Sequence, residues 1–436
     1  MTKFNVFKKT FLLLFCAVLL SALFGCGNKA PDSLSSDSSN QATDESNKPD
    51  DNSFLIDSVK DFTDGFAWVT FTDSQNNQKN ACINTKGEVQ FVLEDILNNP
   101  KSGTGEFNTG YAVVTESDNS YIIDNKGNIT SSSKDGKYDK IVSYGDGYFL
   151  AEKYNNNLHE VNYTYSVIDC NGNTLASDCF ILNESSLSFD YRQNGVFSCC
   201  VQTYDLFGSK SYKYDCYSVK TKQKFTLDHV KAFFNYEGEH AIIVTEENIQ
   251  LIDANGKGKE LVFPEIPYRS EIDILSRITN DCFVYCIRNY DSGEIPDNSV
   301  YIYTVSSGKI NELYHCGQGI SADLCDYNDK EFLLEIRDNT KIKTWFVIVD
   351  HQGKELFTPV EGDPTGLSCN RIVTQSNIYD NKGKMITVAN TDSLGFSKKY
   401  HDNLVAVKNY KNGDSDFKNY IDINGNLLFP ENRITL

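Results

Sequence analysis

Beyond residue 52, short apolar runs alternate with polar turns along the whole chain. Many of the runs mix aromatic and β-branched residues, as at residues 66–69 (Phe-Ala-Trp-Val) and 111–114 (Tyr-Ala-Val-Val). Such runs, bounded by turn residues, predict short strands. Helical periodicity is nearly absent, and only residues 89–97 fit either a short helix or a strand. We therefore predict an all-β fold.

A turn made of Asp or Asn, two further residues and Gly recurs after apolar strands. The clearest copies end at Gly87, Gly127, Gly172, Gly256, Gly353, Gly383 and Gly425, and weaker copies end at Gln223 and Gly308. The first side chain accepts hydrogen bonds from the backbone, and Gly takes a left-handed conformation that other residues adopt at a cost. We therefore interpret the seven glycines as structural turn residues of β-hairpins.

The nine anchor positions recur with a mean spacing of about 42 residues. A second signal, a polar turn followed by an aromatic or β-branched strand, precedes most anchors. Three or four short strands per unit is the strand density of a propeller blade. The pattern favours a seven- or eight-bladed β-propeller, with a β-solenoid or a split β-domain as the alternative. Nine anchors do not require nine blades, because the short interval 353–383 allows two anchors to share one.

The last copy comes closest to a known repeat. Residues 404–407 read Leu-Val-Ala-Val, and residues 420–430 read Tyr-Ile-Asp-Ile-Asn-Gly-Asn-Leu-Leu-Phe-Pro. This resembles the unit of the bacterial WG-repeat (KWG-repeat) proteins, and the resemblance covers residues 55–430. The copies are divergent, because neither Trp68 nor Trp345 precedes a Gly. The resemblance implies a repeat architecture and no particular reaction.

The first 26 residues predict export and lipidation. A basic start is followed by an apolar run, residues 11–24, that is too short to span a bilayer comfortably and fits a signal peptide. The run ends in Leu-Phe-Gly-Cys, which resembles the lipobox of bacterial lipoproteins, with Phe24 as a departure from the usual small residue. Cys26 is then the lipidated residue. An ordinary signal peptide cut elsewhere, or an uncleaved anchor, is the alternative.

Three parts of the chain follow from these patterns. Residues 1–25 are predicted to be a lipoprotein signal peptide, residues 26–52 the lipidated cysteine with a disordered tether, and residues 53–436 the β-repeat domain. Residues 27–52 are rich in Ser and acidic residues and hold no aromatic residue. Such a segment cannot bury enough apolar surface to fold.

Charge narrows the choice of partners. The 436 residues include 60 Asp and Glu against 41 Lys and Arg, a formal net charge of -19. An acidic chain of this kind is not expected to bind nucleic acid, because phosphate contacts need a basic surface. Eleven cysteines follow Cys26, without zinc or redox spacing, and most lie in apolar runs. We interpret them as small buried hydrophobic residues, with at least one left unpaired by the odd number.

The search for reactive groups finds no motif. The six histidines form no HExxH pattern, and the chain lacks a nucleophile elbow, a phosphate-binding loop and a dinucleotide fingerprint. A calcium interpretation of the turns at Asp169, Asp253 and Asp422 fails, because Gly falls at the fourth position rather than the sixth of an EF-hand loop. We therefore predict no catalytic residue, no metal site and no cofactor. A spatial carboxylate pair of the glycosidase type is not visible in sequence.

Tyrosine clusters offer one binding feature, at residues 163–165, 212–214 and 301–303. Packing within the sheets is the favoured interpretation of these clusters. An aromatic platform that binds a glycan or peptide is the alternative. The sequence thus predicts an extracytoplasmic binding or scaffolding lipoprotein, tethered to the cell membrane at Cys26, with a protein or envelope glycan as partner. The alternatives are a glycan hydrolase or lyase on a propeller fold, and a solute-binding lipoprotein of a transporter.

Overall fold

A computed structural model describes residues 52–436, except 101–103, 158–159, 183–187, 205–209, 238, 246–247, 263–269, 280, 290–296, 318, 329, 339, 387–393, 410–414 and 430. The chain divides into two units, Met1–Pro49 and Asp50–Leu436, and only the second is described here. The first unit, with Cys26, the predicted signal peptide and most of the predicted tether, lies outside the described residues.

The described residues of the second unit form eight antiparallel sheets, in which consecutive strands of the chain are neighbours. The first sheet contains β1 (Ser53–Val59), β2 (Phe66–Thr72), β3 (Gln78–Asn84), β4 (Val89–Val92) and, from the chain end, β34 (Arg433–Thr435). The second contains β5 (Tyr111–Glu116), β6 (Asn119–Asp124) and β7 (Ile129–Ser132). The third contains β8 (Lys140–Gly145), β9 (Tyr148–Asn157), β10 (Glu160–Ile168) and β11 (Thr174–Leu182).

The fourth sheet has seven strands: β12 (Ser188–Tyr191), β13 (Val196–Tyr204), β14 (Lys210–Ser218), β15 (Gln223–Glu237), β16 (His240–Thr245), β17 (Ile249–Asp253) and β18 (Gly258–Glu260). The fifth contains β19 (Ser270–Thr279), β20 (Cys282–Asn289), β21 (Asp297–Thr304) and β22 (Lys309–Tyr314). The sixth contains β23 (Ile320–Tyr327), β24 (Glu331–Asp338), β25 (Lys343–Asp350) and β26 (Val360–Glu361).

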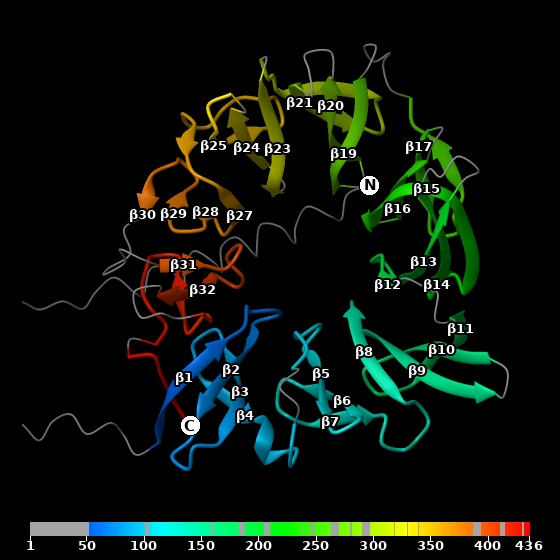
Figure 1. Cartoon of the computed structure of the whole chain (residues 1–436), viewed down its shortest axis with the longest axis vertical. Helices are drawn as coiled ribbons and strands as arrows, with labels where there is room; N and C mark the ends of the chain where they lie inside the picture. The colour runs from blue at the N-terminus through cyan, green and yellow to red at the C-terminus, as the bar shows by residue number, and fades with distance from the viewer. Residues whose placement is uncertain are drawn as a thin grey trace, which may run out of the picture. The chain divides into compact units, whose positions relative to one another are not determined.

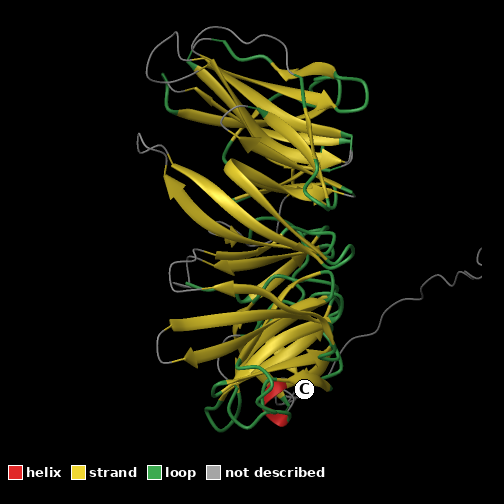
Figure 2. Ribbon diagram, turned by 90° about the vertical axis from the view of Figure 1, so that its right-hand side faces the viewer, coloured by secondary structure: helices red, strands yellow, loops and turns green. Residues whose placement is uncertain are grey.

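The seventh sheet contains β27 (Pro364–Ser368), β28 (Arg371–Thr374), β29 (Ile378–Asp380) and β30 (Met385–Ile386), and the eighth contains β31 (Leu394–Phe396), β32 (Leu404–Asn409) and β33 (Asn419–Asp422). Figure 1 shows these sheets in chain order around a ring, and β8, β19, β23 and β27, each the first strand of its sheet, lie toward the middle. The protein is therefore all-β and has the sheet arrangement of an eight-bladed β-propeller. In the described residues the one helical element is a short 3₁₀ turn, Leu93–Asp95, which directly follows β4 (Figure 2).

The seven-stranded sheet holds two repeat units that share β15, so the eight sheets carry nine repeat units. The first half of this long strand pairs with β14 and the second half with β16, and the two halves meet near His229, which has a φ of 56°. Leu227 and Ile243 lie in one apolar cluster although they belong to the same sheet. The strand is irregular at His229, and its two halves belong to two repeat units. We expected the shared blade at the interval 353–383; this is wrong, because Gly353 and Gly383 belong to the sixth and seventh sheets.

Apolar side chains pack between successive repeat units rather than in one central core. Nine buried clusters are present among the described residues, and each joins one unit to the next. One cluster contains Ile122 of β6 and Phe149 of β9, for example. Because both faces of the sheets are covered in this way, the strands are apolar on both sides, as the sequence runs indicate.

The ring closes between the chain ends. β34 pairs with the first half of β1, and Ile434 is fully buried in the cluster that also contains Val69 and Tyr420. The Tyr420 hydroxyl donates a hydrogen bond of 2.5 Å to the backbone oxygen of Lys60. Both strand pairing and side-chain packing therefore join the last repeat unit to the first.

Candidate functional site

Six of the predicted turn glycines lie in the hairpin between the last two strands of a repeat unit, and Gly425 follows β33, the last strand of the eighth sheet. All seven have φ values between 74° and 89°. In the last copy the Gly425 amide donates to the backbone oxygen of Asp422, and the Asp422 carboxylate accepts from the amides of Asn424 and Asn426. The carboxylate oxygens are thus occupied by the turn itself.

Reactive side chains do not converge in the part of the chain that the structure describes. No group of three or more His, Cys, Asp or Glu residues there has an arrangement suited to a metal ion. His315 pairs with Glu312 at 2.9 Å on the surface, and His351 packs edge-on against Phe332. His159 is outside the described residues.

None of the eleven cysteines beyond Cys26, all of them described, forms a disulfide, and eight of them are buried. This agrees with their interpretation as small apolar residues. Cys199 and Cys200 point to opposite faces of β13, since they belong to different apolar clusters. Burial raises the pKa of the Cys82 thiol to about 12, which keeps it protonated and unreactive.

The tyrosine clusters contribute mainly to packing. Tyr301 stacks on Tyr285 at 5.4 Å between ring centres, and Tyr303 is buried against Phe283. Tyr163 of β10 contacts Tyr154 of β9, and Tyr154 is 41% exposed. Tyr214 of the remaining cluster is buried, so among these described rings Tyr154 is the one that offers an exposed aromatic surface.

A cavity of about 410 Å³ lies between the second and third sheets, on the side of their first strands. Its lining residues are Gly105, Glu106, Phe107, Asn108, Val113, Thr115, Lys140, Ile141, Val142, Ser143 and Tyr144. This volume falls in the usual range of small-ligand sites, about 300–1,000 Å³. We take this cavity as the candidate functional site.

One wall of the cavity is a segment, residues 104–108, that the first sheet holds in place. The Trp68 indole donates to the Gly105 oxygen at 2.9 Å, Lys60 donates to the Thr104 oxygen, and the Phe107 amide donates to the Thr63 hydroxyl. The segment pairs with β5 at few points, among them the Gly105 amide with the Val113 oxygen. Asn108 and Tyr111 also exchange backbone hydrogen bonds, so the segment lies beside β5 as an irregular first strand of the second sheet.

The opposite wall is β8, the terminal strand of the third sheet. It pairs with β9, and the register shifts between Ser143 and Gly145. A bulge of this kind changes the direction of the side chains beside it. Ile141 is buried at the base, whereas Val142 and Ser143 remain partly exposed. The wall thus combines an apolar base with a strand edge to which no other described strand is paired.

The charged residues at the cavity balance each other. Glu106 and Lys140 are both exposed and stand on opposite walls. Burial lowers the pKa of the nearby Lys60 ammonium, and the Glu106 carboxylate partly opposes that shift. The lining holds one acid, Glu106, one base, Lys140, and neither a histidine nor a cysteine.

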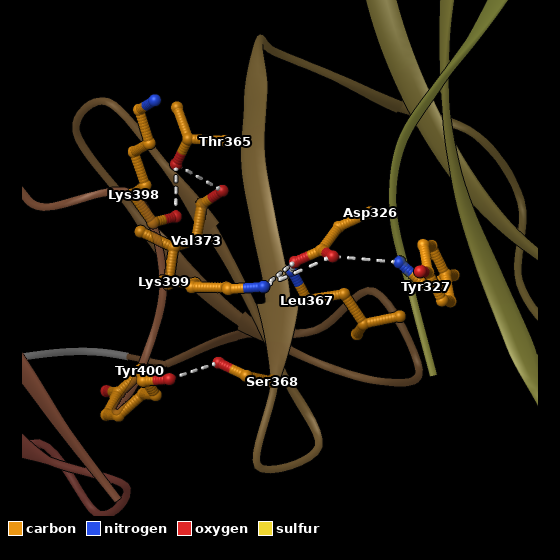
Figure 3. Close-up of polar contacts among 9 residues, drawn as sticks. All are labelled: Asp326, Tyr327, Thr365, Leu367, Ser368, Val373, Lys398, Lys399 and Tyr400. Carbon is orange, nitrogen blue, oxygen red and sulfur yellow. Dashed lines mark hydrogen bonds and ion pairs between the residues drawn. The ribbon is translucent and has the colours of Figure 1, made fainter. Parts of the chain in front are cut away.

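A second polar cluster connects the last three sheets. Asp326 of β23 accepts from the Leu367 amide of β27 at 2.9 Å and pairs with Lys399 at 3.2 Å (Figure 3). Thr365 and Ser368 of β27 donate to backbone oxygens of residues 398 and 400. These groups form their hydrogen bonds and their ion pair with one another. The cluster therefore joins the sheets and leaves few polar atoms to bind a ligand.

Sequence reasoning missed the cavity. Its two walls lie some 35 residues apart in the chain, and its opening depends on Lys60, Thr63 and Trp68 of the first sheet. The one local signal is Gly105, where a β-carbon would come within 2.9 Å of the Val113 oxygen. A single glycine in a polar stretch is too common to mark a site.

Comparison with known proteins gives fold-level similarity at low scores. The β-propeller domain of the Trilobed protease from Pyrococcus furiosus is 10% identical over 66% of this chain and 96% of that domain, with a TM-score of 0.35. Oligopeptidase B from Leishmania major is 8% identical over 82% of this chain, with a TM-score of 0.36. The tricorn protease is 10% identical over 86%, with a TM-score of 0.33.

The chain spans about half the length or less of these two whole peptidases, 53% of oligopeptidase B and 43% of the tricorn protease. Peptidase activity is a property of those proteins. No protein-family model matches the sequence, and no curated relative matches it. Among the described residues, no helix is long and apolar enough to cross a bilayer.

Proposed function

We propose that this protein is an extracytoplasmic lipoprotein that is anchored at Cys26 and binds or scaffolds a partner through its propeller. One observation carries the proposal: a lipobox-like Leu-Phe-Gly-Cys at residues 23–26 precedes a chain that folds into a ring of repeat units. A lipid at Cys26 would hold the ring at the cell membrane. The Ser-rich residues 27–52 would give it reach.

The binding role is supported by how the repeat units are joined. Nine apolar clusters and the β1–β34 pairing hold the ring as one body, which presents loops and strand edges in fixed positions. Preorganised surfaces of this type bind partners without a large ordering cost. The similarity to WG-repeat proteins belongs to the same proposal, and it adds a repeat architecture and no reaction.

A lipid-labelling experiment tests the anchor. Cells producing the full chain are fed an alkyne-modified palmitate, and membranes and soluble fractions are separated. We expect label and membrane association to disappear together in Cys26→Ala. Cys16→Ala is the matched control, because it removes a cysteine from the same leader, and it should keep both. Labelling that persists in Cys26→Ala would overturn the proposal, as would a wild-type chain that is released without a lipid.

A further inference from the structure

An exposed isoleucine lies at the tip of the β24–β25 hairpin. Ile342 is 94% exposed, the largest value among the large apolar side chains of the described residues. Its φ is 54°, in the left-handed region, where a β-branched side chain is strained. The other non-glycine residues with positive φ in the described chain are polar, apart from the thiol of Cys369. The hairpin thus keeps an apolar side chain where Asn or Gly would fit with less strain.

The hairpin holds this side chain outward on a defined turn. The Asp338 carboxylate accepts a hydrogen bond from the Lys341 amide, and the Lys341 ammonium pairs with the same carboxylate at 2.8 Å. On the other side of Ile342, Lys343 pairs with Glu361 at 3.6 Å. The charges beside the tip are therefore offset locally. An isoleucine that is exposed to this degree adds little to packing within the domain, so its role has to come from a contact outside it.

Hydrogen bonds between sheets show which loops lie at the same end of the ring. Asp402, in the loop between β31 and β32, accepts from the Gly65 amide in the loop between β1 and β2 at 2.8 Å. Ser368, the last residue of β27, donates to a backbone oxygen of that same β31–β32 loop. Asp326, near the end of β23, accepts from the Leu367 amide near the end of β27. The first strands of the sixth, seventh, eighth and first sheets therefore run toward one end of the ring and begin at the other.

Ile342 and the start of the domain both lie at the end where these strands begin. β1 begins at Ser53, and the Leu436 amide at the chain end donates to the Asn52 oxygen at 3.2 Å. β24 is antiparallel to β23, so the β24–β25 hairpin is at the same end as Asn52. We call this the entry end. Leu55 and Leu436, 57% and 44% exposed, add apolar surface near Asn52.

The predicted tether favours the entry end as the one that faces the membrane. Residues 27–51, which are 25 residues, separate Cys26 from Asn52. A flexible chain of that length spans roughly 25–30 Å, at about 5–6 Å times the square root of the residue number. β24 has eight residues and is itself about 26 Å long. The opposite end would meet the bilayer only if the tether ran the length of a strand and used most of its reach.

A flat partner fits this arrangement better than a pocket in a protein. Ile342 belongs to the sixth sheet, whereas Leu55 and Leu436 lie at the first, and the seventh and eighth sheets come between them around the ring (Figure 1). A bilayer contacts separated points of one end at the same time. Lysines beside an inserted apolar group keep their ammonium groups at the level of the lipid headgroups. The tether raises the local concentration, so a weak contact is sufficient.

We infer that the entry end of the ring rests on the surface of a phospholipid bilayer, with the Ile342 side chain inserted between the lipid headgroups. This inference rests on the proposed anchor at Cys26 and adds the orientation of the ring on the membrane. Because consecutive strands alternate in direction, the hairpins with the turn glycines lie at the opposite end. They would face away from the membrane and remain open to a partner.

A photoreactive amino acid tests the contact in the full chain. A diazirine-bearing residue replaces Ile342 in one sample and Met385 in the other. Met385 is 53% exposed and comes directly after the turn at Gly383, so it is a matched control near the opposite end. Membranes that contain the palmitate-labelled chain are irradiated, and mass spectrometry identifies the adducts. We expect phospholipid adducts at position 342 in about tenfold or greater yield than at position 385.

The other results of this experiment overturn the inference. Equal lipid yields at the two positions would mean that the ring has no preferred end. Adducts with protein alone at position 342 would mean that a protein covers the isoleucine, and no adduct would mean that it stays in water. A chain that takes up no palmitate label removes the anchor and the inference together, whereas a labelled chain without lipid adducts removes the inference alone.

Substitutions at the tip give a second measurement. With the photoreactive residue moved to position 341, Ile342→Asn should lower the yield of lipid adducts about threefold or more. Ile342→Leu keeps an apolar side chain and should retain the yield. Ile342→Asn should also raise the midpoint of urea unfolding, which shows that the variant is folded, because Asn adopts the left-handed conformation more readily. An unchanged yield in Ile342→Asn, or an equal loss in Ile342→Leu, overturns the inference.

Discussion

Gly383 faces the aromatic ring of Phe357, and a β-carbon on Gly383 would come within 2.6 Å of Cδ2 of that ring. Gly383 closes a turn in the seventh sheet, whereas Phe357 follows β25 in the sixth. The same relationship joins Gly127 to Phe91, and Gly87 to Phe429 across the ring closure. The turn glycine is therefore required for two reasons. Its backbone adopts a left-handed conformation, and the lack of a side chain leaves space for the preceding repeat unit.

Replacing this glycine should cost far more than replacing a glycine of equal backbone conformation in open space. Gly383→Ala combines a left-handed alanine, about 1 kcal/mol, with overpacking against Phe357, about 1–3 kcal/mol. Gly65 has a similar φ of 80° and no atom near its missing side chain, so Gly65→Ala should cost about 1 kcal/mol. Urea denaturation measures both. Equal losses would show that contact with Phe357 is unimportant.

Closure of the ring can be tested with two isoleucines. Ile434 of β34 is fully buried, whereas Ile342 is 94% exposed. Ile434→Ala removes apolar packing and should destabilise the protein by about 2–5 kcal/mol. Ile342→Ala should change stability by no more than about 0.5 kcal/mol. Thermal and urea unfolding distinguish these outcomes, and a small loss in Ile434→Ala would mean that β34 adds little to the closure.

The two contacts of Asp326 should differ in strength. Asp326→Ala leaves the buried Leu367 amide without its acceptor, which should cost about 1–3 kcal/mol. Lys399→Met removes only an ion pair whose lysine is 41% exposed, and such pairs contribute about 1 kcal/mol or less. Unfolding free energies of the two variants measure the difference. A larger loss in Lys399→Met would assign the sheet junction to the ion pair instead.

Acid should weaken the repeat turns. Burial by itself would raise the pKa values of Asp124, Asp253 and Asp422, but hydrogen bonds from the turn outweigh it and bring each pKa below the ordinary 3.8. Because the folded-state pKa is the lower one, the stabilisation is complete above about pH 4 and is lost as the pH falls through the folded-state values. Unfolding measured between pH 6 and pH 2 should show this loss.

Asn substitutions check the assignment of that loss. Replacing the three aspartates by Asn, singly and then together, should flatten the acid limb stepwise, since each removes one titrating carboxylate. If the triple variant loses stability in acid as steeply as the wild type, other carboxylates are responsible.

Thiol reactivity should follow burial. The pKa of Cys325 is raised to about 12 by burial and by the adjacent Glu335 carboxylate, and that of Cys82 to about 12 by burial. At pH 8 both are protonated, so iodoacetamide should leave them unmodified in the native protein, as mass spectrometry would record. In concentrated urea all eleven thiols should react. Rapid native labelling of Cys82 would contradict the packing between the first two sheets.

Much of the fold was readable because each repeat unit carries a local signal. Asp422 and Gly425 specify a hairpin through bonds within five residues, and that signal survives the loss of the Trp-Gly pair. The weak anchor at Gln223 illustrates the limit. There Lys222 takes the left-handed conformation, with a φ of 56°, and the following strand continues for 15 residues into the next unit.

The number of sheets and the candidate site depend on longer distances. Two repeat units share β15 because this strand pairs with both β14 and β16. The spacing between turn anchors in the sequence does not reveal this pairing. The cavity depends on Trp68 holding Gly105 from another sheet. Contacts between units decide both features, and the sequence pattern within one unit says nothing about them.

The pairing of β1 with β34 also has a mechanical consequence. Tension that enters the domain along the chain at Asn52 reaches Ser53–Leu55 first, and these residues are bonded to Arg433–Thr435 at the other end of the sequence. Arg433 adds two side-chain bonds to Ser53. The force is thus shared from its first step between the first and the last strands of the ring. A force applied at the start of the domain therefore acts on the β1–β34 pairing that closes the ring before it acts on any turn or on the cavity.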